Sequence, residues 1–207
     1  ELALRENDVE AMRAIVRAIA GTTDSTVYLA NRLLTLARIE HGSEAAVMAP
    51  VSLPSVVRQV GLELALPAVE KQIDLALEAP EEALINGQAL MLHELVSNLV
   101  DNAIRYTPVG GNVLLRVQAV EDGILLEVRD SGPGIAQGER EKVFTPFYRV
   151  AATMEVNPSG TGLGLAIVRD IAALHRAVVT LAPNGSGPGL SVSIVFPPLH
   201  GGWGSTR

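Results

Sequence analysis

The segment HELVSNLVDNAIRY, residues 93–106, decides the class of fold to be expected. Its apolar residues recur at steps of three and four and predict one broad apolar face of a helix. The opposite face carries Glu94, Asn98, Asn102 and Arg105. Asparagine is a poor helix former, so two asparagines one turn apart indicate a specific use, such as an oxygen ligand for a hard cation. An ordinary solvated polar face is the alternative for this helix taken alone.

The segments around this helix include both helical and strand patterns. We expect helices over 55–71, 88–106 and 163–175, and strands over 73–78, 83–86, 112–120, 124–129, 178–181 and 190–196. Asp122-Gly123 is a strong hairpin signal between two of these strands. Because helices and antiparallel hairpins segregate along the chain, the pattern predicts a two-layer α+β domain.

The first part of the chain has a different pattern. Residues 8–41 contain no proline and carry an apolar stripe that is typical of a long helix in a bundle or coiled coil. Residues 1–6 are helix-forming and precede an Asn7-Asp8 turn, which predicts the tail of an antiparallel partner helix and a chain that begins inside a helix. The predicted domains are a helical hairpin (1–46), a linker or short edge strand (47–53), an α/β domain (54–199) and a frayed tail (200–207).

Two glycine-rich segments are candidate binding loops. DSGPGI, residues 130–135, follows a strand, where its glycines let the backbone approach a ligand and Asp130 can accept a hydrogen bond from an exocyclic amine. GTGLGL, residues 160–165, opens a helix, where main-chain N–H groups form an anion site. Each segment alone is also compatible with an ordinary turn, and the second matches neither a P-loop nor a dinucleotide fingerprint.

The composition excludes several classes of protein. The 207 residues suffice for a sizeable core, which must be aliphatic because the chain has only three Phe, three Tyr and one Trp. A net charge of -7 disfavours nucleic-acid binding, and the absence of cysteine excludes disulfides and thiolate chemistry. The longest stretch without charged residues or histidine, 177–199, contains a proline- and glycine-rich turn, which argues against a membrane helix.

The order of these segments, with FTPFYR at 144–149 between the two loops, resembles the ATP-binding catalytic domain of sensor histidine kinases. That domain is part of a wider family of ATPases and kinases that includes gyrase, the Hsp90 chaperones and MutL. Its N, G1, F and G2 boxes resemble residues 93–106, 130–135, 144–149 and 160–165. The resemblance covers about 54–196, and residues 33–40 resemble the end of the second helix of the dimerisation and phosphotransfer hairpin. It implies the two-layer α/β sandwich of the histidine kinase, gyrase and Hsp90 type.

The resemblance also implies a site for ATP and Mg²⁺. Asn102 would coordinate Mg²⁺, Asn98 would support the metal or the phosphates, and Arg105 would contact phosphate oxygens. Asp130 would recognise the adenine amino group, and residues 150–159 would form a lid. The other implied ATP contacts are Tyr106, Gly132, Gly134, Ile135, Phe147, Arg149, Thr161, Gly162, Leu163, Gly164 and Leu165.

One position separates kinases from hydrolases within this family. Hydrolysing members carry a general-base Glu four residues before the metal-binding Asn, and here that position is Asn98, whose amide cannot take a proton from water. The kinase interpretation is therefore favoured over a hydrolytic ATPase. A degenerate module for nucleotide binding or dimerisation is the other alternative.

The histidines do not supply a phosphoacceptor. None of the four lies in the expected acceptor motif of a first hairpin helix, and we interpret all as structural or surface residues: His41, His93, His175 and His200. A protonated His175 could favour the C-terminus of its helix. We expect the acceptor upstream of Glu1.

The predicted function is the catalytic core of a bacterial two-component sensor histidine kinase. It would bind Mg-ATP and transfer the γ-phosphoryl group to a histidine for relay to an aspartate of a response regulator receiver domain. The family also implies a homodimer in the parent protein, no nucleic-acid partner, and a cytoplasmic portion of a parent in the bacterial inner membrane.

Overall fold

The structure is a computed structural model that describes residues 12, 13, 15, 48–151, 160–185 and 187–199. The chain divides into two compact units, Glu1–His41 and Gly42–Arg207. Of the first unit only residues 12, 13 and 15 are described, and they are helical. The predicted hairpin, the lid residues 152–159 and the tail 200–207 therefore lie outside the described residues.

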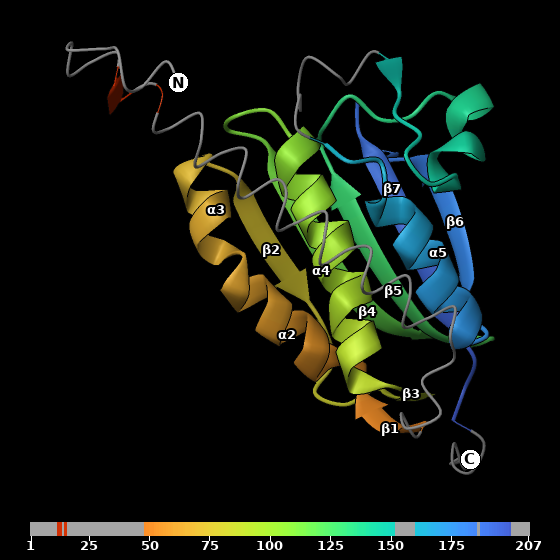
Figure 1. The fold of residues 1–207 in the computed structure, drawn as a ribbon. Coiled ribbons are helices and arrows are strands. Elements are labelled where there is room, and N and C mark those ends of the chain that lie inside the picture. Colours follow the sequence, from red (N-terminus) through yellow and green to blue (C-terminus); the bar gives the residue numbers. More distant parts are fainter. Residues whose placement is uncertain (1–11, 14, 16–47, 152–159, 186, 200–207) are drawn as a thin grey trace. The chain divides into compact units, whose positions relative to one another are not determined.

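A five-stranded mixed sheet forms one layer of the second unit (Figure 1). Its strand order is β2-β4-β5-β7-β6, and β2 is parallel to β4 whereas the other pairs are antiparallel. The hairpin predicted at Asp122-Gly123 is confirmed, with Val120 opposite Gly123. The bounds are β2 Asp74–Glu78, β4 Asn112–Val120, β5 Gly123–Asp130, β6 Val178–Pro183 and β7 Leu190–Phe196.

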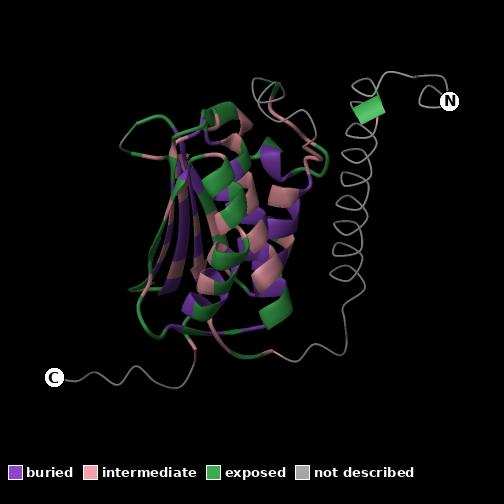
Figure 2. Ribbon diagram, turned by 90° about the vertical axis from the view of Figure 1, so that its left-hand side faces the viewer, coloured by how far each residue is buried: buried purple, intermediate pink, exposed green. Residues whose placement is uncertain are grey.

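Helices cover one face of this sheet and form the second layer (Figure 1). They are α2 Leu53–Glu63, α3 Ala65–Glu70, α4 Ala89–Tyr106 and α5 Gly164–Leu174, and α4 contacts both α2 and α5. The apolar stripe of α4 provides fully buried Leu92 and Leu95, which meet a sheet core that includes Leu115 and Leu126. Figure 2 shows these buried positions concentrated between the two layers. The predicted two-layer α+β fold is confirmed.

Three local features refine the sequence prediction or differ from it. The helix expected over 55–71 is two helices, because Pro67 has no N–H for the carbonyl of Glu63 and the chain breaks at Leu64. Of the two alternatives predicted for residues 47–53, a linker or a short edge strand, the structure has a strand, β1 (Ala49–Ser52), which pairs antiparallel with β3 (Leu84–Gly87). Between the DSGPGI and GTGLGL segments, where the sequence predicts no helix, the chain forms two short 3₁₀ helices, η2 (Gln137–Glu139) and η3 (Lys142–Phe144).

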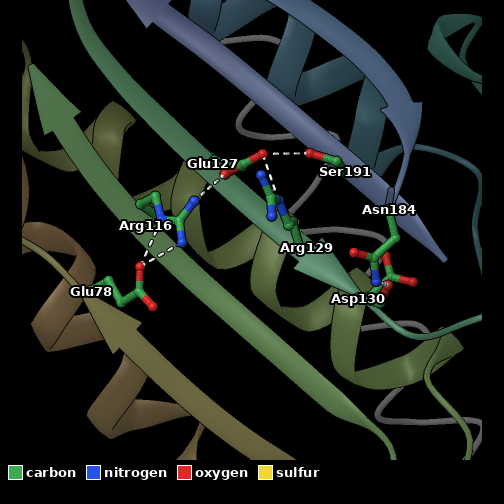
Figure 3. Close-up of polar contacts among 7 residues, drawn as sticks. All are labelled: Glu78, Arg116, Glu127, Arg129, Asp130, Asn184 and Ser191. Atoms are coloured by element: carbon green, nitrogen blue, oxygen red, sulfur yellow. Dashed lines mark hydrogen bonds and ion pairs between the residues drawn. The ribbon is translucent and has the colours of Figure 1, made fainter. Parts of the chain in front are cut away.

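The sheet face away from the helices carries a ladder of charges (Figure 3). The guanidinium of Arg116 lies 2.7 Å from a carboxylate oxygen of Glu78 and 3.6 Å from one of Glu127. Glu127 is only 6% exposed and accepts hydrogen bonds from Arg129 Nε at 2.7 Å and Ser191 Oγ at 2.8 Å. Pairing compensates the charge of this buried carboxylate, and the ladder links β2, β4, β5 and β7. Within the described part of the chain, none of the helices combines the length and the apolar character needed to cross a bilayer.

Candidate functional site

The middle of α4 carries a buried amide with an unsatisfied oxygen. Asn98 is 1% exposed, and its Nδ2 donates to the main-chain oxygen of Glu94 at 2.7 Å and to its Oε1 at 3.1 Å. Among the described residues, Asn98 Oδ1 has no hydrogen-bond partner. A buried acceptor without a partner costs about 1–3 kcal/mol. This oxygen therefore fits a cation or a donor that a ligand brings with it.

Gly164, the first residue of α5, lies close to the side-chain amides of Asn98 and Asn102. A Cβ atom at Gly164 would lie 2.9 Å from Asn102 Nδ2 and 3.3 Å from Asn98 Oδ1. Within the described segment 160–185, no side chain caps the N-terminus of α5, and its first turn has no acidic residue. The main-chain N–H groups of that turn can therefore serve an anion. Amide oxygens suited to a hard cation and a helix N-terminus suited to phosphate thus meet at one place.

Two sets of polar contacts involve the C-terminal turn of α4: those of Lys71 with main-chain oxygens and those of Arg105 with Asp101. Lys71 Nζ donates to the main-chain oxygens of Ile104 at 2.9 Å and Arg105 at 2.7 Å. Burial lowers the pKa of Lys71, and the positive charge of Arg105 lowers it further. Arg105 Nε lies 2.8 Å from both carboxylate oxygens of Asp101. The guanidinium predicted to meet phosphate is therefore held along α4 by Asp101.

Asp130, the last residue of β5, presents one carboxylate oxygen without a protein partner. Its Oδ1 accepts hydrogen bonds from the main-chain N–H of Gly132 at 2.8 Å and of Leu190 at 3.3 Å. Burial raises the pKa of this carboxyl, and the two backbone hydrogen bonds oppose that rise. No donor of the described residues lies within hydrogen-bond distance of Oδ2. Oδ2 is therefore suited to accept a hydrogen bond from the exocyclic amine of a ligand.

The F-box and G2-box segments contact each other directly. The N–H of Phe147 donates to the main-chain oxygen of Gly162 at 3.0 Å. Gly162 has a φ of 72°, and a Cβ atom there would lie 2.7 Å from the carbonyl carbon of Phe147. Phe147 also has a positive φ, 65°, and its side chain is 62% exposed. Tyr148 donates its hydroxyl proton to the Glu139 carboxylate, which ties the F-box segment to η2.

Comparison with known families identifies the chain. Residues 87–200, more than half of the chain, match the model of the histidine kinase-, DNA gyrase B- and HSP90-like ATPases. The chain belongs to this family. All four motif segments, including α4 and the N-terminus of α5, lie within the matched residues. Membership in this ATPase family makes the meeting point of α4 and α5 a nucleotide-binding site candidate.

Sensor kinases are prominent among the similar proteins. Sensor protein kinase PmrB of Pseudomonas aeruginosa is 37% identical over 197 residues, which cover 95% of this chain and 41% of PmrB. Sensor protein QseC of Salmonella typhi is 36% identical over 169 residues, 81% of this chain and 36% of QseC. The chain thus spans about 40% of the length of these curated relatives.

Solved structures show the same fold. The mycobacterial sensor histidine kinase MprB is 30% identical with a TM-score of 0.63, and the match covers 74% of this chain and all of that chain. Full-length ShkA in complex with AMPPNP is 29% identical with a TM-score of 0.73, over 95% of this chain and 40% of that chain. The domain is therefore homologous to the ATP-binding domain of sensor histidine kinases, and the predicted family and sandwich fold are confirmed.

Most predicted site residues of this kinase-like ATPase domain gather on four segments. Asn98, Asn102 and Gly164 approach one another, and a Cβ atom at Gly132 would lie 2.9 Å from the main-chain oxygen of Tyr106. Gly134 has a φ of 72°. Four further candidates are half-buried, Ile135, Arg149, Thr161 and Leu165, whereas Leu163 is fully buried. Their contacts with ATP stay predictions.

The prediction for His175 as a helix-terminal cation is wrong. The ring is 3% exposed, its Nε2 accepts a hydrogen bond from the N–H of Gln88 at 3.0 Å, and its Nδ1–H donates to the Ile171 oxygen at 2.7 Å. Burial lowers its pKa, and the hydrogen bond to Ile171 opposes this only in part. His175 is therefore a neutral link between the start of α4 and the end of α5. His93 contacts Glu63 at 2.9 Å on the surface.

The sequence did not point to three residues that support the site. These are Lys71, which holds the end of α4, and Leu190 and Asn184, which contact Asp130. Asn184-Gly185 was identifiable only as a turn signal. Their roles depend on contacts between distant parts of the chain.

Proposed function

We propose that this chain is the catalytic core of a bacterial two-component sensor histidine kinase, which transfers the γ-phosphoryl group of ATP to a histidine side chain. The observation that supports this most is the meeting of the Asn98 and Asn102 amides with the uncapped N-terminus of α5. Sequence similarity to sensor kinases adds to it.

The adenine and the phosphates of ATP each have a matching group in the chain. Asp130 Oδ2 accepts a hydrogen bond from the adenine amine, and the N–H groups of the first turn of α5 bind phosphate oxygens. The amide oxygens of Asn102 and Asn98 would hold Mg²⁺, which neutralises phosphate charge when bound. The orphaned Asn98 oxygen and the space that a Cβ atom at Gly164 would fill fit such a group. Arg105 reaches phosphate oxygens by exchanging its contact with Asp101.

The chemistry of position 98 favours transfer over hydrolysis. An amide cannot remove a proton from water, and Asn98 already uses its Nδ2 for Glu94. Phosphoryl transfer depends mainly on positioning and charge neutralisation, which the amides and backbone N–H groups supply. The nucleophile is then an imidazole of a dimerisation and phosphotransfer hairpin. Further proposed features are homodimerisation of the parent, relay to a response regulator receiver domain, and a cytoplasmic position below an inner-membrane anchor.

Phosphorylation in trans tests the proposal. The chain is mixed with labelled Mg-ATP and with a form extended upstream of Glu1 in the same gene that carries Asn102→Ala. We expect acid-labile, base-stable label on the longer chain, and none when the shorter chain also carries Asn102→Ala. Nucleotide binding without label would support a degenerate binding module instead. Steady hydrolysis without phosphoprotein would support a hydrolytic ATPase.

A further inference from the structure

The turn between β6 and β7 contacts Asp130 at two places, and Figure 3 shows the one made by Asn184. Asn184, which directly follows β6, donates from Nδ2 to the main-chain oxygen of Asp130 at 2.7 Å. Leu190, the first residue of β7, donates its N–H to Asp130 Oδ1 at 3.3 Å. The N–H of Asn184 donates to the Gly189 oxygen at 3.2 Å, which brings the two sides of the turn together. One turn thus contacts both the main chain and the carboxylate of Asp130.

The turn lies directly against Asp130. A Cβ atom at Gly189 would collide with the main-chain oxygen of Asp130 and would lie 2.9 Å from Asn184 Nδ2. Only a residue without a side chain fits between these groups, so the turn approaches as closely as its backbone allows. Asn184 is half-buried in this position, and its amide reaches a residue 54 positions earlier in the chain.

Different parts of the structure hold the two groups that contact Asp130, the Leu190 N–H and the Asn184 amide. Leu190 is followed by Ser191, whose hydroxyl donates to Glu127 at 2.8 Å, and Glu127 is held in turn by Arg129. Pairing of β5 with β7 therefore sets the position of the Leu190 N–H independently of Asn184. The carbonyl of Asp130, by contrast, lies at the end of β5 beyond the last pair of that ladder, Arg129 with Ser191. The N–H side of this peptide group, from Ser131, donates to the Asn112 oxygen at 3.1 Å, and the Asn184 amide holds its carbonyl side.

We propose that Asn184 is a positioning residue that sets selectivity for adenine: by fixing the main-chain carbonyl of Asp130, it holds Oδ2 where the exocyclic amine of the base must donate. The inference rests on the role of Asp130 proposed above. Adenine places an amine donor at this point, whereas guanine places a carbonyl oxygen, which a carboxylate repels. Discrimination between the two bases requires a carboxylate that does not turn. Without the Asn184 amide the carbonyl side of this peptide group can tilt while its N–H side stays bound to Asn112, and the carboxylate shifts away from the amine, which weakens the adenine contact.

Asn184→Ala tests the inference through base selectivity. The dissociation constants of Mg-AMPPNP and its guanine counterpart Mg-GMPPNP are measured by titration calorimetry. We expect adenine affinity to fall about tenfold, the loss for roughly one hydrogen bond, with little change for the guanine analogue. Thr180→Ala is the matched control, because Thr180 is exposed on the same hairpin. It leaves both affinities unchanged.

A double-mutant cycle separates positioning from turn stability. In an Asp130→Ala background, Asn184→Ala has no further effect on adenine affinity if it acts through the carboxylate. An equal loss in both backgrounds overturns the inference, as does wild-type adenine affinity in Asn184→Ala while Asp130→Ala binds weakly. Wild-type affinity in Asp130→Ala instead refutes the proposed role of Asp130 itself. Asn184→Asp retains the side-chain size but cannot donate to a carbonyl when ionised, and we expect the same loss of selectivity from it.

Discussion

Replacing Gly164 by alanine separates ligand binding from folding at the meeting point of α4 and α5. The added Cβ atom lies 2.9 Å from Asn102 Nδ2, and ordinary contact begins at 3.4 Å, so this amide must withdraw by about 0.5 Å. Asn98 Oδ1, at 3.3 Å, is also crowded. The methyl group would occupy space that we propose for the metal and the phosphates.

The cost of Gly164→Ala to folding is of a size that a typical domain tolerates. Overpacking costs about 1–3 kcal/mol, and replacing glycine by alanine in a helix returns up to about 1 kcal/mol. We therefore expect a net loss of at most about 2 kcal/mol in the free energy of unfolding. Misplacing a positioning group by 1 Å costs about 10²-fold in function, so we expect Mg-AMPPNP affinity to fall at least about tenfold.

Titration calorimetry gives the affinity, and urea unfolding of the same samples gives the stability. Gly138→Ala is the matched control, because no atom lies within 4 Å of a Cβ atom at that position. It retains wild-type affinity. Wild-type affinity in Gly164→Ala would refute the assignment of metal and phosphate to the space between the two helices.

Three further outcomes concern the stability of the domain. The unfolded chain binds a proton on His175 more readily than the folded chain, so the free energy of unfolding falls as pH decreases below about 6.5, by up to about 1.4 kcal/mol per pH unit. Urea titrations between pH 5 and 8 check this, and an equal slope in His175→Gln would contradict it. Gly162→Ala places a side chain on a residue with a φ of 72° and against the Phe147 backbone, so we expect the free energy of unfolding to fall by at least about 1 kcal/mol. Thermal unfolding measures this, with Gly138→Ala as the control. An unchanged melting temperature in Gly162→Ala would be inconsistent with this geometry. Leu126→Ala leaves a cavity at a fully buried position, so we expect the free energy of unfolding, measured in urea, to fall by about 2–5 kcal/mol. Val178→Ala is the control, because Val178 is 66% exposed and its replacement should change stability little. Similar losses for both variants would contradict the described core.

The elements that the sequence predicts well are those with local causes. The β4–β5 hairpin follows from Asp122-Gly123, and the apolar stripe of α4 follows from helical periodicity. The break at Leu64 also has a local cause, since Pro67 lacks an N–H, yet the surrounding helical periodicity masks it. The sequence leaves residues 47–53 open between a linker and a short edge strand, because only the pairing of β1 with β3 decides between the two.

In the candidate site, too, the sequence predicts features with local causes and misses those that depend on contacts between distant residues. Motif order predicts which residues gather, because glycines and asparagines at fixed spacing carry that information. It does not predict what holds them. Lys71 reaches the end of α4 across 33 residues, and Asn184 reaches Asp130 across 54, so neither contact leaves a local pattern. His175 shows the same limit, because only its tertiary burial makes it neutral.

The link made by His175 has a mechanical consequence for the pair of long helices. At one end, its ring joins the start of α4 to the end of α5. At the other end, Gly164 lies against the Asn98 and Asn102 amides without room for a methyl group. Sliding of one helix along the other would break contacts at both ends together. These contacts therefore resist a shift of α4 relative to α5 along the helix axes.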